Sequence, residues 1–307
     1  MSINSNKINS NKNTLAIFGL LFGALAWGII WYPYRLMAEA GVSGVASSFY
    51  TYCIATFIAG IYFATPTLKH WRGLFNQPKT VIWIGLFAGC TNLSYVLAVI
   101  DGEVMRVMLL FYLSPLWTLL LARFWLKEPI TTAGFISIVI ALVGASTMLA
   151  GPFSAVESHL PIPRNTSEWL ALSAGIGFSL TNVITRNSHH LSLQAKSFAV
   201  WIGVVSVALM FAPFLGESFP KPSFFSLTEW LIMTGIALLL IAATMLVQFG
   251  VTQLTAIRAS VLFLFELVVA AIASYYLAHE AMSLNEWIGG LLIIAAALTS
   301  ALNHGHD

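Results

Sequence analysis

Charged residues are scarce in this chain. Only 8% of its 307 residues are Asp, Glu, Lys or Arg, whereas an ordinary soluble domain carries about 25%. Its 14 basic and 12 acidic side chains are too few to cover the surface of a soluble protein of this length. Because 58% of the residues are hydrophobic, this scarcity of charge indicates an integral membrane protein.

Cysteine is also scarce, since the chain holds only Cys53 and Cys90, each inside an apolar segment. Two isolated thiols exclude a disulfide framework and a CxxC metal or redox motif. The absence of a basic patch interleaved with aromatic residues argues against nucleic acid binding. No nucleophile–base pair, phosphate-binding loop or His cluster lies inside the apolar segments, so we expect no enzyme and no cofactor, and a membrane-embedded enzyme or sensor is the less favoured alternative.

Apolar runs of about 20 residues, long enough for a helix to cross a hydrocarbon core of ~30 Å, recur along the chain. The sequence predicts an all-α integral membrane protein with ten transmembrane helices, at residues 14–36, 44–65, 80–100, 104–122, 131–151, 168–186, 195–215, 228–252, 256–278 and 285–303. The polar, Asn-rich residues 1–13 and residues 304–307 are expected to be cytoplasmic tails, the first of them disordered. A Pro-rich linker at residues 152–167 joins two five-helix halves, residues 14–151 and 168–303.

Lys and Arg residues predict the orientation, because positively charged loops stay in the cytoplasm. With a cytoplasmic amino terminus, ten of the 14 basic residues fall on the cytoplasmic side. The other side then holds Arg35, Arg106, Arg164 and Lys221. Both termini are therefore expected in the cytoplasm, and the membrane is expected to be the bacterial inner (plasma) membrane.

The two halves of the chain are similar to each other. Shifted by 152 residues, Arg106 aligns with Arg258 and Glu128 with Glu280, without a gap. Each half has an odd number of predicted helices, so the second half enters the membrane with the opposite polarity. The sequence therefore predicts two inverted-topology repeats, an architecture common among secondary transporters.

The chain resembles the drug/metabolite transporter superfamily, and more narrowly its ten-helix EamA-type transporters, in the pair Trp27-Gly28, the stretch YLSPLWTLLLARFWLKEPIT and its second copy FLFELVVAAIASYYLAHEAMS. The resemblance covers residues 14–303. It implies inverted halves around a central cavity and the export of small metabolites such as amino acids, amines or nucleobase-like compounds. In this family the second block usually has Glu-Pro where this chain has Glu266-Leu267, so we expect an unkinked helix there.

Glu266 lies about halfway along the ninth predicted helix, where a charged side chain costs about 3 kcal/mol to insert. Such residues face the interior of a helix bundle or a wet cavity. Glu266 could couple transport to a proton or neutralise an amine of the substrate. The alternative is a neutral carboxylic acid that bonds to a neighbouring helix. The first interpretation is favoured because no other carboxylate is predicted at mid-depth.

Aromatic residues gather in the first predicted helix, where Trp27, Trp31 and Tyr34 share one face. Pro33 removes a backbone donor, so we expect the helix to bend or open there. The two Trp side chains could line a cavity that holds a cationic or aromatic ligand. Alternatively, the segment is an interfacial aromatic belt anchored by Arg35.

Mid-helix amides and hydroxyls form a second set of candidates, since a largely apolar site needs a few polar groups to orient its ligand. Ordinary interhelical hydrogen bonds and core packing remain the alternatives. Glu128 and Glu280 are expected to cap the helix that follows each of them. The predicted substrate-binding residues are Trp27, Trp31, Asn92, Tyr95, Tyr112, Asn182, Gln248, Phe263 and Glu266.

These features predict a secondary transporter, monomeric or homodimeric, that exports a small organic solute by alternating access. The solute is expected to carry an amino or aromatic group, and Glu266 is the expected coupling residue, with the proton as the candidate coupling ion. An importer or an uncoupled facilitator is the alternative.

Overall fold

The computed structural model describes residues 2–64, 77–101, 107, 110–149, 163, 165–277 and 284–302. Within these residues every regular element is a helix. The first half contains α1 (Ser2–Glu39), α2 (Gly44–Ala64), α4 (Pro78–Asp101), α6 (Ser114–Leu121) with a π-helical extension (Ala122–Leu126), and α7 (Thr132–Leu149). The second half contains α8 (Thr166–Asn187), α9 (Leu193–Phe211), α10 (Leu227–Gln253), α11 (Ala256–Phe263), α12 (Phe265–Leu277) and α13 (Leu284–Leu302), with short 3-10 turns at Ala212–Leu215 and Pro222–Phe224.

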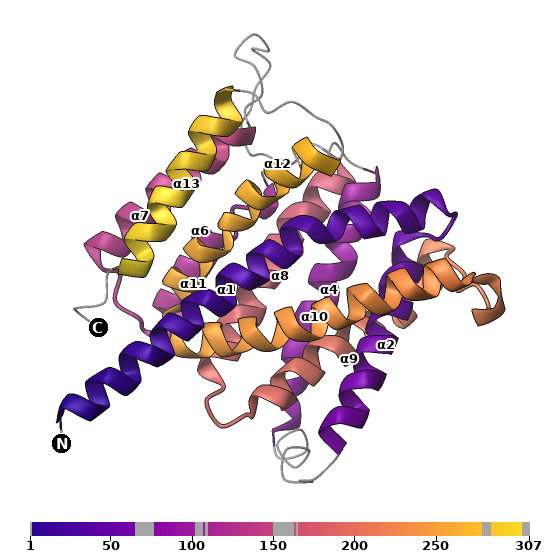
Figure 1. Ribbon diagram of the computed structural model, residues 1–307, viewed down its shortest axis with the longest axis horizontal. Helices are drawn as coiled ribbons and strands as arrows, with labels where there is room; N and C mark the ends of the chain where they lie inside the picture. Colours follow the sequence, from indigo (N-terminus) through magenta and orange to yellow (C-terminus); the bar gives the residue numbers. More distant parts are fainter. Residues whose placement is uncertain are drawn as a thin grey trace.

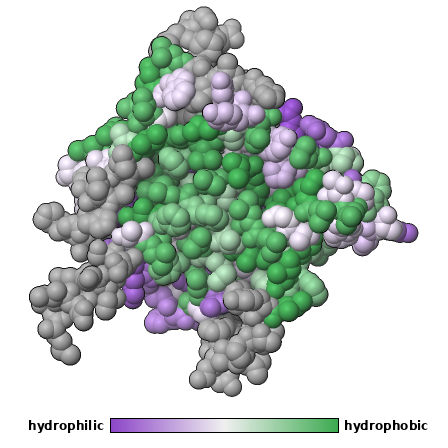
Figure 2. Space-filling view, in the orientation of Figure 1, coloured by the Kyte–Doolittle hydropathy of each residue, from purple (hydrophilic) through white to green (hydrophobic). Residues whose placement is uncertain are grey.

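The helices present a hydrophobic exterior, as a bilayer requires. Six segments in the described part of the chain are long and apolar enough to cross a membrane: Lys12–Glu39, Gly44–Ile61, Pro78–Ala98, Leu193–Leu215, Leu227–Gln253 and Ala256–Leu277. Shorter apolar helices are found at Gly134–Thr147 and Trp287–Ala296. Figure 2 shows a broad hydrophobic surface across the middle of the visible face, with hydrophilic residues nearer its edges. In a membrane protein such a surface faces lipid.

The first helix is longer than expected. α1 starts at Ser2, so most of the tail expected to be disordered continues the helix instead. Residues 1–13 contain neither Gly nor Pro, so no residue there breaks a helix that extends outward from the apolar segment. The helix also runs through Pro33 to Glu39 without interruption. A single proline removes only one intrahelical hydrogen bond, and the expected opening of the helix is not seen.

The expectation of an unbroken helix around Glu266-Leu267 is wrong. A turn at Leu264 separates α11 from α12. The N–H of Leu264 donates to the carbonyl of Val261 at 3.2 Å, and the N–H of Leu267 donates to the carbonyl of Leu264 at 3.1 Å. These three-residue spacings tighten the chain and end the regular α-helical ladder, although no proline is present.

A similar turn occurs in the first half, at Tyr112 and Leu113 just before α6. There the N–H of Leu113 donates to the carbonyl of Leu110 at 3.3 Å. Pro115 occupies the first turn of α6, where its missing N–H needs no partner. Tyr112 and Leu264 are 152 residues apart, so the two breaks coincide with the internal repeat, although only the first has a proline beside it.

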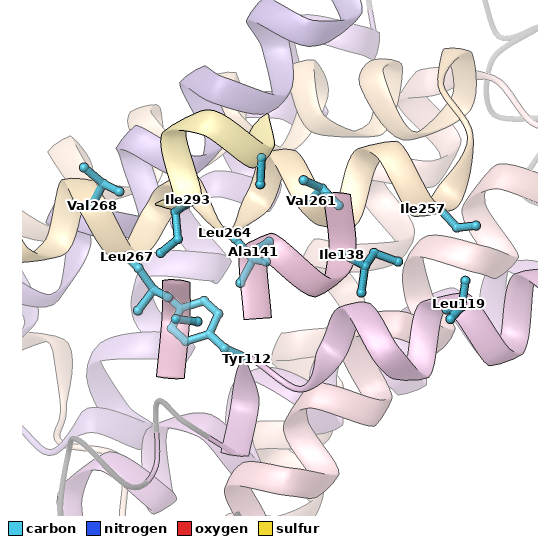
Figure 3. Packing of buried hydrophobic residues seen from close by; sticks show 12 residues of the cluster. Tyr112, Leu119, Ile138, Ala141, Ile257, Val261, Leu264, Leu267, Val268 and Ile293 are labelled. Carbon is cyan, nitrogen blue, oxygen red and sulfur yellow. The ribbon is translucent and has the colours of Figure 1, made fainter. Parts of the chain in front are cut away.

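The helices pack in pairs (Figure 1): α7 lies along α13, α1 along α10, and α4 contacts both α8 and α9. One buried apolar cluster joins α6, α7, α11, α12 and α13. Figure 3 shows its members, among them Tyr112, Ile138, Val261, Leu267 and Ile293. Leu264 is a buried member of this cluster, so the turn just before α12 lies within packed apolar side chains.

Glycines allow α4 and α9 to approach closely. A Cβ atom placed on Gly85 would lie 2.8 Å from the carbonyl oxygen of Ala199, and one on Gly89 would lie 2.6 Å from that of Gly203. A Cβ on Gly203 would overlap the backbone of Gly85. Because backbone atoms cannot rotate away, these contacts require residues without side chains.

We predict that Gly203→Ala lowers the thermal stability of the purified protein by about 1–3 kcal/mol, because α4 and α9 must move apart. Gly235→Ala on α10 is the matched control, since a Cβ there has no atom within 4 Å. It should be neutral or slightly stabilising, as alanine favours a helix over glycine by about 1 kcal/mol. Thermal unfolding in detergent compares the two, and equal melting temperatures would contradict the packing account.

Candidate functional site

Three aromatic rings from separate helices meet inside the bundle. Trp27 of α1 lies 5.6 Å from Phe263 of α11 and 6.1 Å from Phe178 of α8, measured between ring centroids. The rings of Phe178 and Phe263 are 5.1 Å apart. Edge-on and tilted contacts at these distances are favourable for aromatic pairs. Two predicted site residues, Trp27 and Phe263, are thus in direct contact.

The ring contacts continue towards the first half of the chain. Phe111 lies 5.7 Å from Phe178, 5.2 Å from Tyr95 of α4 and 5.5 Å from Tyr112. We call the six residues Trp27, Tyr95, Phe111, Tyr112, Phe178 and Phe263 the aromatic cluster. Both halves of the chain contribute to it, so a relative movement of the halves would change its shape.

Glycines on two helices bring this cluster together. A Cβ atom on Gly28 of α1 would lie 2.8 Å from the Cβ of Val269 and 2.9 Å from the carbonyl oxygen of Glu266. A Cβ on Gly175 of α8 would lie 2.7 Å from the carbonyl oxygen of Phe111. The Trp-Gly pair of α1 therefore has a physical explanation, since Gly28 lets the helix that carries Trp27 pass against α12.

The carboxyl group of Glu266 lies at the edge of the aromatic cluster. Glu266 is in the first turn of α12, directly after the break at Leu264, and is partly buried. Its side chain has Tyr112 as a hydrogen-bond partner, and Tyr95 also interacts with it electrostatically. The free N–H groups at a helix start favour a carboxylate there. The arrangement combines one carboxyl group with several ring faces, and both attract cations.

Two buried amide groups have unused hydrogen-bonding capacity. The Nδ2 of Asn182 on α8 and the Oε1 of Gln248 on α10 are buried and have no hydrogen-bond partner. Thr244, one turn before Gln248, accepts a hydrogen bond of 3.2 Å from the indole of Trp201 instead. Because a buried polar atom without a partner costs about 1–3 kcal/mol, the free donor and acceptor are suited to a ligand or to water.

Two further predicted residues lie on the same helices as members of the aromatic cluster, Trp31 on α1 and Asn92 on α4. Trp31 has a ring contact with Tyr32 of its own helix, at 5.7 Å. Asn92 is partly buried on α4, three residues before Tyr95.

The sequence did not predict Phe178 as a site residue, although its position one turn before Asn182 is a signal for it. Among the residues described, no three His, Cys, Asp or Glu side chains could together hold a metal ion.

Glu128 does not cap the helix that follows it, contrary to expectation. Its Oε1 accepts a hydrogen bond of 3.3 Å from the Nε of Arg186, and its Oε2 accepts one of 3.1 Å from the backbone N–H of Ala256. The side chain of Thr131 caps α7 instead, which leaves the carboxylate free to cap α11. The corresponding expectation for Glu280 lies outside the described residues.

The model of the EamA-like transporter family matches residues 14–150 and, a second time, residues 165–302. The chain belongs to this family. It is thereby part of the drug/metabolite transporter superfamily, as the sequence resemblance indicated. The aromatic cluster takes four residues from the first matched region and two from the second.

The chain is also similar to curated transporters at low sequence identity. A protein of Archaeoglobus fulgidus named "Uncharacterized transporter" is 22% identical over 228 residues, which cover 74% of this chain and 78% of that protein. A protein of Rickettsia bellii named "S-adenosylmethionine uptake transporter" is 25% identical over 238 residues, covering 78% and 76%. Its namesake in Rickettsia prowazekii is 26% identical over 238 residues, covering 78% and 75%.

A protein solved by crystallography shares the fold, with a TM-score of 0.76 at 17% sequence identity over 94% of this chain and 96% of that one. The family, the names of the relatives and the apolar helices together identify an integral membrane transporter of a small molecule.

The free acceptor on Gln248 leads to a prediction about stability. Gln248→Met removes a buried polar atom without a partner while keeping the length of the side chain, so the melting temperature should stay the same or rise. Thr244→Val, one turn away on the same helix, leaves the indole N–H of Trp201 without an acceptor and should cost about 1–3 kcal/mol. Thermal unfolding of both variants is the measurement. An equal loss of stability in both would show that Gln248 has a structural partner.

Proposed function

We propose that this protein is a secondary transporter with ten transmembrane helices, in which two inverted five-helix halves, residues 14–151 and 168–303, alternate around the aromatic cluster. Both termini lie in the cytoplasm, and the membrane is a bacterial inner membrane. The solute is a small organic molecule with an amine or another positive centre and an aromatic or amphipathic part. The observation that carries this proposal is the placement of Glu266 at the aromatic cluster, where it has Tyr112 as a hydrogen-bond partner and interacts electrostatically with Tyr95.

Support for the two halves comes from several observations that agree. The family model matches the chain twice, in regions that nearly coincide with the proposed halves. The turns at Tyr112 and Leu264 occur at equivalent positions of the internal repeat. An odd number of helices per half gives the halves opposite polarity, which is a common architecture for alternating access.

The solute class follows from the chemistry of the site. Ring faces attract a cation by about 0.5–2 kcal/mol each, more as water is excluded. One carboxyl group, that of Glu266, can balance one positive charge. The amide groups of Asn182 and Gln248 offer a donor and an acceptor for the polar parts of the same solute. Such a site binds a cationic aromatic or amphipathic solute better than an anion.

Glu266 also provides a means of coupling. A carboxylate in an apolar site is stabilised either by a bound cation or by a proton. Solute and proton then compete for the same group, so release of one on a given side of the membrane accompanies uptake of the other. This competition is the simplest form of proton-coupled exchange, and it predicts that Glu266 is neutralised in every state that moves across the membrane.

The proposed direction is outward, as the family resemblance implies. Uptake is the second candidate, and it is favoured by the names of the relatives from Rickettsia. Competition at Glu266 is compatible with both directions, because the gradients of solute and proton set the direction of net flux in a reversible carrier.

The test is counterflow of labelled solutes into proteoliposomes at two pH values on either side of neutrality. The panel holds amino acids, polyamines, nucleosides and S-adenosylmethionine. We expect exchange of a cationic solute, and Glu266→Gln should reduce it about tenfold or more, the factor that ~1.4 kcal/mol of lost binding gives. The pH dependence of the native protein should also disappear in this variant.

Glu39→Gln is the matched control. Glu39 is exposed at the end of α1 and pairs with Arg35 at 3.2 Å, so its neutralisation should leave exchange unchanged. Exchange by Glu266→Gln at the native rate and with the native pH dependence would refute the role of Glu266. Absence of exchange of every solute in the panel would count against the proposed solute class.

A further inference from the structure

A buried polar group ties the two halves together at one end of the bundle. Glu128, just after the π-helical extension of α6, bonds to Arg186 near the end of α8 and to the N–H of Ala256 at the start of α11. Arg186 in turn donates to the carbonyl of Thr252 near the end of α10. We call Glu128, Arg186, Lys196, Thr252 and Ala256 the clasp. Four of its five residues belong to the second half, and Glu128 alone reaches it from the first.

The charges of the clasp are shielded from water. The side chains of Glu128 and Arg186 are only 13% and 21% exposed, and Lys196 is 1% exposed. The Nζ of Lys196 donates to the carbonyl of Thr185 at 3.0 Å and to the hydroxyl of Thr252 at 3.1 Å. Removal of one partner from a buried ion pair leaves the other charge unpaired at high cost. Without its carboxylate, the clasp would hold two cations and would open.

Small apolar side chains pack beside the clasp. Ala122, Val183 and Ala256 form a cluster in which no side chain is more than 1% exposed. Ile184 on α8 and Ser188 just after it, two residues to either side of Arg186, line a cavity of about 590 Å³. The end of α8 therefore carries Val183 of this apolar cluster, Arg186 of the clasp and a residue that lines the cavity, Ile184, within one stretch of chain.

The clasp is also connected to the proposed site. Glu128 caps the start of α11, and the last residue of α11 is Phe263 of the aromatic cluster, three residues before Glu266. α11 has only 8 residues and moves as one body, so a shift of its start displaces the residues at its end. Four basic residues belong to the clasp or lie near it in the chain: Arg186 and Lys196 are members, and Arg123 and Lys127 are close to Glu128 in sequence. This composition predicts the cytoplasmic side.

We propose that Glu128 is a positioning residue whose clasp closes the cytoplasmic mouth of the solute pathway and must open once in each transport cycle. This inference rests on the proposed alternating access. It assigns the closed mouth to named contacts: an ion pair to Arg186 and a cap on α11. The closed arrangement holds the first half against the second, and its release lets α11 and the aromatic cluster shift.

Thiol labelling tests the clasp without any transported solute. The native thiols are removed as Cys53→Ser and Cys90→Ser, and the reporter is Val183→Cys, a fully buried position beside the clasp. A membrane-impermeant maleimide is applied separately to inside-out and right-side-out vesicles. We expect slow labelling in this background, and about tenfold faster labelling from the cytoplasmic side alone after Glu128→Gln, a shift of the opening equilibrium by ~1.4 kcal/mol.

Arg123→Gln is the matched control, since Arg123 is exposed on the π-helical extension and carries the same charge as Arg186. It should label at the background rate. Labelling of Glu128→Gln at the background rate, or equally faster labelling from both sides, would overturn the proposal. If Glu128→Gln does not fold, Glu128→Asp decides: it keeps the charge but shortens the reach, and faster cytoplasmic labelling supports the clasp while background labelling overturns it.

The result is independent of the proposed solute and of Glu266. Faster labelling of Glu128→Gln, together with failure of solute exchange in the native protein, would leave the clasp in place and reject the proposed solute class. Exchange of a cationic solute by the native protein, together with labelling of Glu128→Gln at the background rate, would support the proposed solute class and reject the clasp.

Discussion

A polar group inside a membrane protein must find its partners within the chain, because the hydrocarbon around it offers none. Glu266 is the clearest case here. Its carboxyl group is at mid-length in an apolar segment, and it interacts with Tyr112 and Tyr95 from two other parts of the fold. The surrounding helices pack closely here, since Gly28 lets α1 approach α12 and Gly175 lets α8 approach the backbone of Phe111. Much of the arrangement around the aromatic cluster follows from this one requirement.

The turn at Leu264 meets the same requirement for the backbone. A carboxylate in the middle of a continuous helix would have no free N–H groups near it, whereas one in the first turn of a new helix has several. By ending α11 at Phe263, the chain places Glu266 in such a turn. Irregular backbone at membrane depth is tolerated where it is buried in protein, and the apolar cluster around Leu264 and Tyr112 provides this burial (Figure 3).

The sequence predicted the helical class and much of the helix placement because hydrophobic length is a strong signal. It also singled out Trp27, Tyr112 and Glu266, since aromatic and acidic residues stand out in an apolar chain. Phe178 was not predicted, because a phenylalanine in such a chain looks like lipid-facing packing until its neighbours are known. The break at Leu264 was missed because the prediction relied on proline, whereas the turn depends on tertiary packing. The partners of Glu128 could not be found either, because they lie far from it in the chain.

The two acidic residues that flank α11 act on it in complementary ways. Glu128 holds the start of the helix through a hydrogen bond from Ala256, and Glu266 follows its end in the aromatic cluster. α11 has 8 residues and is therefore about 12 Å long. A segment this short does not absorb a displacement by bending, so the position of its start and the geometry at its end are coupled. In the proposed cycle, neutralisation of Glu266 by a proton or a cation changes the forces on one end of α11, and the ion pair of Glu128 with Arg186 resists movement at the other. Alternating access opens only one side at a time and so needs a link between site and mouth, and in the proposed cycle α11 is that link, as a single rigid element.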